Sequence, residues 1–441
     1  MQQCRIWPVG SPTWGAGPAT AIRDIQGRRR TVGAVVVRER DDACPGVVDT
    51  SPADDGLIAR VRLPGGRLDP AQIRELAVLA ERFGTGSVDL TARANVQLRG
   101  LAEADLPAFA DAVAAAGLMP SRSHDRVRNI LASPLAGRDP NALLDADAVL
   151  AAVDRALCAA PDLTALSGRF LVGIDDGGLP IASARHDLDL VAHTEHTFAL
   201  HVAGHDTTRR FGPADAPAAV VHTARAFLAA RARSGAWHIR ELPDGAARFA
   251  ADLAADPGLP DHAPAGPARS RRADAGQPPI GVLAQSDGRF AVGALVPLGR
   301  LTQHHLAALI ALRTELRITG GRGVVLRDVT DPDATLAALE AAGLPCDPAS
   351  PWRGVTACSG LGACRRALAD VRTEATRHAL GRRSPDAAPD RADTHWVGCS
   401  RACGKPAGAT LLVAREDGTY ETAPPHPPHD HPLGQRSSRR G

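Results

Sequence analysis

Four of the eight cysteines fall within one stretch of 46 residues, and thiolates gathered in this way are typical metal ligands. The stretch has the pattern C-x5-C, then 34 residues, then C-x3-C, formed by Cys358, Cys364, Cys399 and Cys403. Four thiolates are the ligand set of a [4Fe–4S] cluster, and neighbouring glycines would let the backbone approach its sulfurs. Structural zinc is one alternative, although roughly two to four residues usually separate its paired ligands. Buried thiols without a metal are the other alternative.

A second set of residues able to do chemistry is a series of arginines on segments that alternate polar and apolar residues. The alternation over 91–99 predicts one strand, and that over 57–63 predicts another. Their polar faces carry Arg93, Asn95, Gln97 and Arg99 on the first strand and Arg60 and Arg62 on the second. Guanidinium groups bind carboxylates through two hydrogen bonds and stay charged, so this pattern predicts a site for a polycarboxylate. The alternative is a solvated sheet face, but such a face normally mixes charges of both signs.

The composition of the 441 residues excludes several classes of partner. The net charge of +2 argues against nucleic acid and membrane surfaces, and an aromatic content of 3% argues against base stacking. No apolar run approaches the length of a membrane span, and the seven apolar residues after the arginines at 28–30 are too few for a signal sequence. We therefore expect a cytoplasmic protein with reduced thiols.

The elements that must position these residues occur twice. A strand, the turn Pro64-Gly65-Gly66 and a helix from Pro70 are expected first, and a second helix is expected over 103–116. The same order returns with a strand over 289–296, the turn at 297–299, a helix over 302–313 and a strand over 315–319. The sequence therefore predicts an internal duplication.

The expected organisation follows from this repeat and from composition. It comprises a disordered extension (1–40), a first half (41–122), an α/β domain (123–254), a linker (255–279), a second half (280–350), a second α/β domain with the cysteines (351–420) and a disordered tail (421–441).

The cysteine motifs resemble the paired cluster signature of the sulfite/nitrite reductase superfamily. Residues 398–406 read G-C-S-R-A-C-G-K-P, and residues 91–100 fit the family's tetrapyrrole-contacting pattern T-x-R-x-N-x-Q-L-R-G. A third family segment is similar to the one that contains Arg128 and Asn129. The resemblance, over about 41–420, implies an α+β fold. In it, duplicated ferredoxin-like half domains form one pseudo-twofold sheet domain, joined by two α/β domains, the second of which holds a [4Fe–4S] cluster.

Within this superfamily, the segments 43–66 and 166–177 resemble the precorrin-3B synthase family. That resemblance implies oxygen-dependent hydroxylation of precorrin-3A, with closure of a lactone, in cobalamin biosynthesis. It also implies dioxygen, a mononuclear non-haem iron and NAD(P)H-derived electrons from an unidentified donor. Arg128, Asn129 and Arg169 would then help the arginine strands bind the tetrapyrrole substrate.

One departure from the reductases favours this interpretation. They place lysines in a segment of the form R-K-F-K, where this sequence has Arg169 and Leu171, and its only lysine is Lys405. A guanidinium does not readily give up a proton. A sirohaem-dependent sulfite or nitrite reductase remains the alternative, followed by a non-catalytic electron carrier and a zinc-stabilised structural protein.

Overall fold

The computed structural model describes residues 22–23, 29–30, 42–179, 181, 185–232, 234–261, 279–381, 392–406 and 408–423. Of the expected extension over 1–40 it describes only the paired strands β1 (Ile22–Arg23) and β2 (Arg29–Arg30). Most of the expected linker over 255–279 and of the tail over 421–441 lies outside the described residues. No helix in the described ranges is long and apolar enough to cross a membrane.

Two five-stranded sheets form the centre of the molecule. The first sheet has the order β15 (Arg300–Thr302), β6 (Ser87–Leu90), β7 (Val96–Leu101), β4 (Gly56–Val61) and β3 (Ser51–Ala53). The second has the order β13 (Gly281–Ala284), β14 (Phe290–Leu295), β17 (Gly323–Val329), β16 (Leu316–Ile318) and β5 (Arg67–Leu68). Each sheet thus takes one short strand from the other half of the chain, which is a reciprocal exchange.

The exchanged strands are held by charge as well as by backbone pairing. Arg300 of β15 lies opposite Asp89 of β6 and forms an ion pair with it at 2.6 Å. In the other sheet, Arg67 of β5 forms an ion pair with Glu315 at 2.9 Å. The two halves therefore form one pseudo-twofold unit, and the expected fold class is confirmed.

Equivalent helices begin after each exchanged strand. Helix α1 (Pro70–Phe83) starts at Asp69, whose carboxylate accepts the amides of Ala71 and Gln72. Helix α6 (Gln303–Leu312) starts at Thr302, whose hydroxyl accepts the amide of His305. Such side chains satisfy amides that the first helical turn leaves unpaired. Helices α2 (Leu106–Ala115) and α7 (Pro332–Ala341) complete the two halves.

The expectation of one strand over 91–99 is wrong in its first part. The chain turns between β6 and β7, with Ala94 at a φ of 55° and Thr91 receiving the Asn95 amide on its hydroxyl at 3.1 Å. The second half makes the same turn, with Arg322 at a φ of 60° and the Gly323 amide on Thr319 at 3.1 Å. Alternation of residue types could not reveal a left-handed residue in the middle of the pattern.

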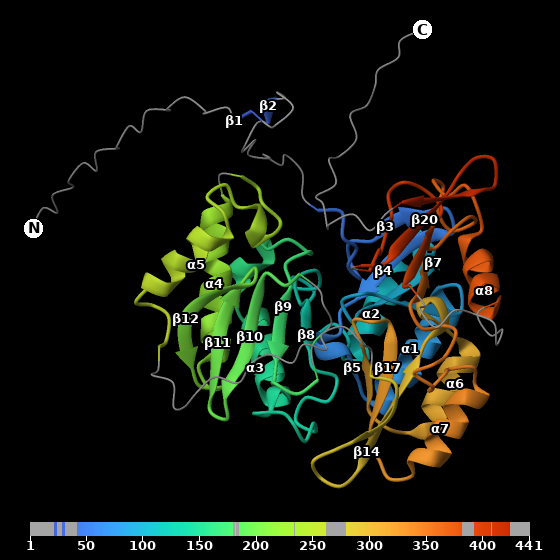
Figure 1. The fold of residues 1–441 in the computed structure, drawn as a ribbon, viewed down its shortest axis with the longest axis horizontal. Helices are drawn as coiled ribbons and strands as arrows, with labels where there is room; N and C mark the ends of the chain where they lie inside the picture. The colour runs from blue at the N-terminus through green and yellow to red at the C-terminus, as the bar shows by residue number, and fades with distance from the viewer. Residues whose placement is uncertain are drawn as a thin grey trace, which may run out of the picture.

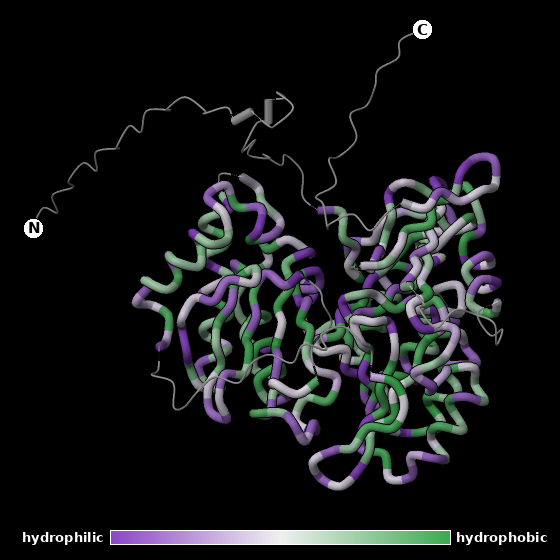
Figure 2. Tube along the Cα trace, viewed as in Figure 1, coloured by the Kyte–Doolittle hydropathy of each residue, from purple (hydrophilic) through white to green (hydrophobic). Residues whose placement is uncertain are grey.

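Two α/β units pack on these halves, and Figure 1 shows the first of them as a separate body beside the paired sheets. Its sheet has the order β12 (His205–Phe211), β11 (Thr197–Val202), β10 (Leu188–Thr194), β9 (Val172–Asp175) and β8 (Ile130–Ala132), with helices α3 (Ala146–Cys158), α4 (Ala216–Arg231) and α5 (Ala246–Ala255). The second unit contains β18 (Val355–Ala357), β19 (Thr394–Val397), β20 (Thr410–Ala414), β21 (Tyr420–Ala423) and α8 (Val371–Gly381). Hydrophobic residues follow the inner strands of both bodies (Figure 2).

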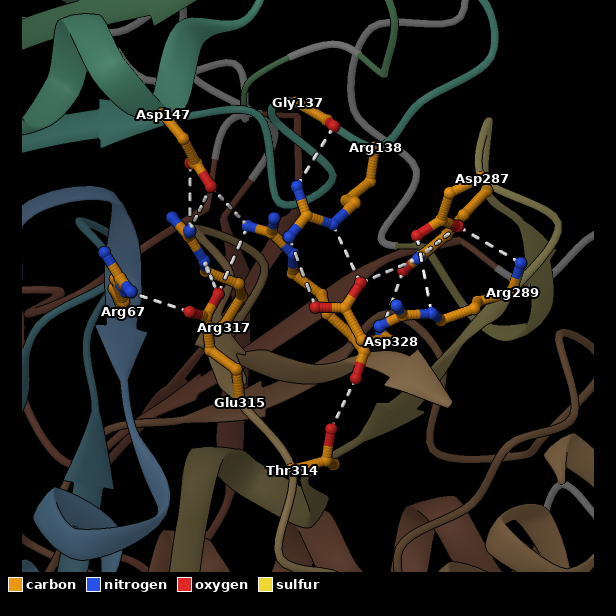
Figure 3. A network of polar contacts seen from close by, with 12 residues as sticks. Arg67, Gly137, Arg138, Asp147, Asp287, Arg289, Thr314, Glu315, Arg317 and Asp328 are labelled. Carbon is orange, nitrogen blue, oxygen red and sulfur yellow. Dashed lines mark hydrogen bonds and ion pairs between the residues drawn. The ribbon is translucent and has the colours of Figure 1, made fainter. Parts of the chain in front are cut away.

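Buried arginines join the first α/β unit to the second half, as Figure 3 shows. Arg317 and Arg327 are at most 1% exposed, and both donate to Asp147 of α3. Arg317 contacts both carboxylate oxygens, at 2.9 and 2.8 Å, and Arg327 contacts one of them at 2.9 Å. Arg138 forms a further ion pair with Asp328 at 2.8 Å. These contacts fix the orientation of the two bodies because a buried charge is costly unless its partner stays in place.

Candidate functional site

A cationic cluster, which we define as Arg60, Arg62, Arg93 and Arg169, gathers around the end of β4, with Arg60 on that strand and Arg62 directly after it. Arg60 lies opposite Gln97 in the sheet and donates to its Oε1 atom from Nε at 3.2 Å. The amide of Gln97 therefore orients the guanidinium of Arg60 across the strand pair.

Arg62 is the most buried member of this cluster, at 1% exposure. Its Nε donates to Asn129 at 3.2 Å and its Nη1 to the carbonyl of Pro45 at 3.0 Å, while its buried Nη2 has no partner in the described part of the chain. Burial, reinforced by the charge of Arg60, lowers the pKa of Arg62 to about 9. A buried cation with an unused N–H is costly without an anion, so this atom is suited to a carboxylate or another oxyanion.

Two asparagines link the arginines to neighbouring backbone through hydrogen bonds. Asn129 accepts from Arg62 and from Asn95, and it donates to the carbonyl of Gly168 at 3.0 Å. Asn95 also accepts the amide of Leu63 at 2.9 Å. With their polar atoms used in this way, Asn95 and Asn129 position the arginines.

Arg93 and Arg169 approach from the two loops on either side. Arg93 lies in the turn before β7 and donates to the carbonyl of Gly168 at 3.4 Å; burial lowers its pKa, and the nearby Arg60 and Arg169 add to that effect. Arg169 is exposed, with its guanidinium carbon 4.9 Å from the centre of the Trp237 ring. The structure thus brings four of the predicted arginines into one electrostatic neighbourhood.

Arg99 and Arg128 have other partners. Arg128 donates to both carboxylate oxygens of Asp154, at 2.8 and 2.7 Å. Arg99 binds Asp55 through two bonds of 2.9 Å and donates to the carbonyl of Ala363 at 2.6 Å. Since their carboxylate-binding edges are occupied, we leave both out of the proposed ligand site. The sequence pattern could not show this because Asp154 and Ala363 are distant in the chain.

Sequence reasoning missed Asp42 as part of this region. Its carboxylate accepts the hydroxyl of Ser167 and the amide of Gly168, both at 2.8 Å. It therefore holds the loop that precedes Arg169. Cys44, which lies outside the cysteine motifs, is close enough to Arg60 to raise the pKa of that arginine against the larger, opposite effect of burial.

The four cysteines of the C-terminal motifs lie on two loops of the second α/β unit. Burial raises the pKa of Cys403, and the charges of Cys399, Cys358 and Cys364 raise it further, so the four thiols are electrostatic neighbours. The amide of Gly398 points at the Cys358 sulfur, at 3.4 Å. Amide donors to sulfur are characteristic of iron–sulfur sites.

The same two loops are joined to each other. The amide of Leu368 donates to the carbonyl of Gly398 at 2.8 Å, and that of Cys358 donates to the carbonyl of Trp396 at 2.9 Å. A Cβ at Gly398 would lie 2.5 Å from that of Ala367, so only glycine fits there. This close packing holds the loops in fixed register.

No three His, Cys, Asp or Glu side chains within the described ranges lie close enough together to hold one metal ion. A single zinc ion needs its thiolates tightly converged, whereas a four-iron cluster separates them by its own width. The four thiols and the Gly398 amide that points at Cys358 are the kinds of group that hold a [4Fe–4S] cluster. The described residues offer no ligand set for the expected mononuclear iron.

The cationic cluster and the cysteine loops approach each other through Arg99. This arginine follows Gln97 by two positions in β7, and it binds the carbonyl of the residue before Cys364. Four thiols, connected through Arg99 to the sheet that carries the cationic cluster on a duplicated α+β fold, are features that point to an oxidoreductase.

Comparison with known proteins agrees with this class. Residues 51–116 match the nitrite/sulfite reductase ferredoxin-like half domain. A ferredoxin–nitrite reductase of Synechococcus elongatus is 31% identical over 404 residues, covering 82% of this chain and 77% of that protein. A precorrin-3B synthase of Sinorhizobium sp is 27% identical over 397 residues, covering 87% and 83%. The solved NirA protein of Mycobacterium tuberculosis has the same fold, with a TM-score of 0.64 at 20% identity, covering 88% and 78%.

The chain belongs to the nitrite/sulfite reductase family. The ferredoxin–nitrite reductase and the precorrin-3B synthase are both oxidoreductases, so the chain is an enzyme of that general type. The resemblance expected from the cysteine and arginine motifs is confirmed at this level.

Proposed function

We propose that this enzyme hydroxylates precorrin-3A with dioxygen and closes a lactone, giving precorrin-3B. The observation that carries the proposal is the chemistry of the cationic cluster, which contains four arginines and no lysine. Leu171, where the reductases have their second lysine, is 1% exposed and packs in the hydrophobic core. A lysine ammonium would not fit there without a buried charge.

The cluster suits a macrocycle that carries several carboxylates. Arginine forks bind carboxylates with two hydrogen bonds, and the unused Nη2 of Arg62 offers one buried donor. In this proposal Arg60, Arg62, Arg93 and Arg169 bind the acetate and propionate arms, and Gln97, Asn95 and Asn129 keep the guanidinium groups in position. A fixed orientation would direct hydroxylation to one carbon of the ring.

Electron supply is assigned to the second α/β unit. We propose Cys358, Cys364, Cys399 and Cys403 as ligands of a [4Fe–4S] cluster, which when bound transfers single electrons. Two of these relatives carry ferredoxin in their names, which supports a ferredoxin-type donor. We propose NAD(P)H as the original source of its electrons. Placing one oxygen atom of dioxygen in the substrate and reducing the other to water consumes two electrons and two protons. We include no mononuclear iron because the described side chains do not converge on one.

A sirohaem-dependent nitrite or sulfite reductase is the second candidate. It is favoured by the 31% identity to a ferredoxin–nitrite reductase and by 28% identity, over 382 residues, to a ferredoxin-dependent sulfite reductase of Mycolicibacterium paratuberculosis. In that case the cationic cluster would bind the carboxylates of a resident sirohaem.

The two candidates give opposite results in one experiment. The protein, reconstituted anaerobically with iron and sulfide, is incubated with reduced ferredoxin and precorrin-3A under labelled dioxygen. Our proposal predicts one labelled oxygen atom per product and no sirohaem absorption. Nitrite or sulfite reduction without labelled product would overturn it.

A further inference from the structure

A buried histidine–aspartate pair lies beside the cationic cluster and has no part in the site described so far. His238 precedes the short 3-10 helix η4 (Ile239–Glu241), and Asp187 precedes strand β10. The Nδ1 atom of His238 is 3.0 Å from Oδ2 of Asp187, and their side chains are 6% and 0% exposed. Fifty-one positions separate them in the chain.

The carboxylate of Asp187 accepts hydrogen bonds at both of its oxygens. Its Oδ1 accepts the amide of Ile239 at 2.8 Å, and its Oδ2 accepts the amide of Leu171 at 3.0 Å. With three donors directed at one carboxylate, Nδ1 of His238 carries a hydrogen. Nε2 is the other nitrogen of the ring, and it makes no hydrogen bond within the described residues.

Three contacts place the pair at the edge of the cationic cluster. Asp187 binds the backbone of Leu171, two residues after Arg169. Trp237, next to His238, lies under the guanidinium of Arg169. The charge of Asp187 also acts on the buried Arg93, whose pKa it raises against the larger effect of burial.

Other titratable groups near the cluster already make hydrogen bonds within the protein. Burial alone would raise the pKa of Asp42, but hydrogen bonds from Cys44 and Ser167 outweigh it and leave that pKa lowered, so Asp42 is an anion. Asp125 accepts the amide of Val48 at 3.1 Å. His124 approaches the carbonyl of Ala160 through Nε2 at 3.0 Å.

We infer that His238 is the proton donor of the reaction, oriented by Asp187, in the role that lysines fill in reductases of this family. The Nε2–H bond breaks, its electron pair stays on nitrogen, and an O–H bond forms at the oxygen atom being reduced. Water then returns a proton to Nε2, while the electrons come from the donor. The identity of that oxygen rests on the proposed function. Reduction of nitrite or sulfite also consumes protons, so it too needs a proton donor.

Several charged groups surround the His238–Asp187 pair. They are Arg93 in the turn before β7, Arg169 across Trp237, and Arg240 and Glu241 on η4 itself.

The test compares His238→Asn with a matched variant elsewhere. His222 of α4 forms the same kind of pair with Asp256, at 2.7 Å, with both side chains about one-third exposed. Both variants are reconstituted, and their cluster spectrum and thermal unfolding are compared with wild type. We expect His238→Asn to lower kcat about 100-fold, as loss of a general acid does, with KM within about threefold. His222→Asn should leave both unchanged.

Two readouts separate proton donation from a structural role. The pH–rate profile of His238→Asn should lose the limb that requires a protonated group, and added imidazole should restore turnover to His238→Ala but not to Asp187→Asn. Wild-type turnover and an unchanged pH profile in His238→Asn would overturn the inference. So would a folded His238→Ala protein that imidazole does not rescue.

Failure of the proposed function gives a different pattern. If wild type makes no labelled product but reduces nitrite, the hydroxylase proposal is wrong, and the same variants are measured in nitrite reduction. Loss of the pH limb there still supports His238 as the proton donor. Unchanged nitrite reduction in His238→Asn overturns it.

Discussion

In the first copy of the duplicated unit, the turn between β6 and β7 carries Arg93 and Asn95, whereas the matching turn between β16 and β17 carries Gly321 and Gly323. In both turns, the residue at the matching position has a left-handed backbone conformation, and a threonine hydroxyl accepts a backbone amide. The backbone is therefore a requirement of the fold, while the side chains are free to differ.

The neighbouring strands extend the contrast. Arg60 pairs with Gln97 in one sheet, and Gly293 pairs with Val325 at the matching place in the other. Val325 packs against Leu135 of the first α/β unit, and a Cβ at Gly293 would lie 2.0 Å from the carbonyl oxygen of Pro279. One copy carries the cationic cluster that we propose as the ligand site, and the matching place in the other copy is covered by the chain itself.

The two α/β units differ in the opposite way from the two halves. The cysteine motifs belong to the second unit, and the first unit has none. Arg99 and Arg327 hold matching places in β7 and β17, and each reaches across to the opposite α/β unit. The duplication therefore kept the linking contacts in both copies, while the cationic cluster and the cysteine motifs lie in different parts of the chain.

The largest expected effect is loss of the cluster from the second α/β unit. Cys403→Ser should abolish the iron–sulfur EPR signal of the reduced protein and all turnover, because an alkoxide is a far poorer iron ligand than a thiolate. Cys158→Ser, in α3 of the first unit, is the control and should keep the full signal. A full signal in Cys403→Ser would show that it is not a ligand.

The next effect removes the charge that distinguishes the first copy. Arg62→Leu should raise the Kd for precorrin-3A about 100-fold, since loss of a buried charged contact typically costs about 2–5 kcal/mol. Equilibrium absorbance titration measures this. Stability should be unchanged or higher in denaturant unfolding, because the burial that lowers the pKa of Arg62 is a cost to the folded state. Unaltered tetrapyrrole affinity would contradict a role for this arginine.

A smaller effect is expected where the second copy is covered. Gly293→Ala should lower the free energy of unfolding by about 1–3 kcal/mol, because the new methyl group meets backbone atoms that cannot rotate away. Arg60→Ala, at the matching place in the first copy, should weaken ligand binding and cost less stability. Urea unfolding of both variants tests the pair, and equal losses would remove the contrast.

The smallest effect concerns Asp328, which matches Gly100 of the first copy. A hydrogen bond from Arg138 lowers the pKa of Asp328 to about 2, against an ordinary 3.8, so its ionised form stabilises the folded state above about pH 4. That contribution is lost as the pH falls through about 2. Because the pair is partly exposed, Asp328→Asn should cost only about 1 kcal/mol near neutral pH. Calorimetry should show the difference from wild type vanishing in acid.

Much of the architecture could be predicted, and the arginine site only in part. The helix from Pro70 is present as α1 (Pro70–Phe83), and the helix expected over 302–313 is α6. Both follow from apolar spacing and a capping residue, which act over a few neighbours. Arg99 and Arg128 were assigned to a ligand because their partners, Asp55, Ala363 and Asp154, cannot be inferred from spacing along a strand.

By itself, the sequence determined the repeated strand–turn–helix order and the grouping of four cysteines, because each depends on residue types within short stretches, and its resemblance to a known superfamily gave the α+β class. Only the tertiary structure decided which arginines are available to a ligand, which copy of the repeat is covered, and that His238 meets Asp187. These outcomes depend on contacts between segments tens to hundreds of residues apart. Local pattern sets the elements, while packing and the pairing of buried charges decide what each side chain can do.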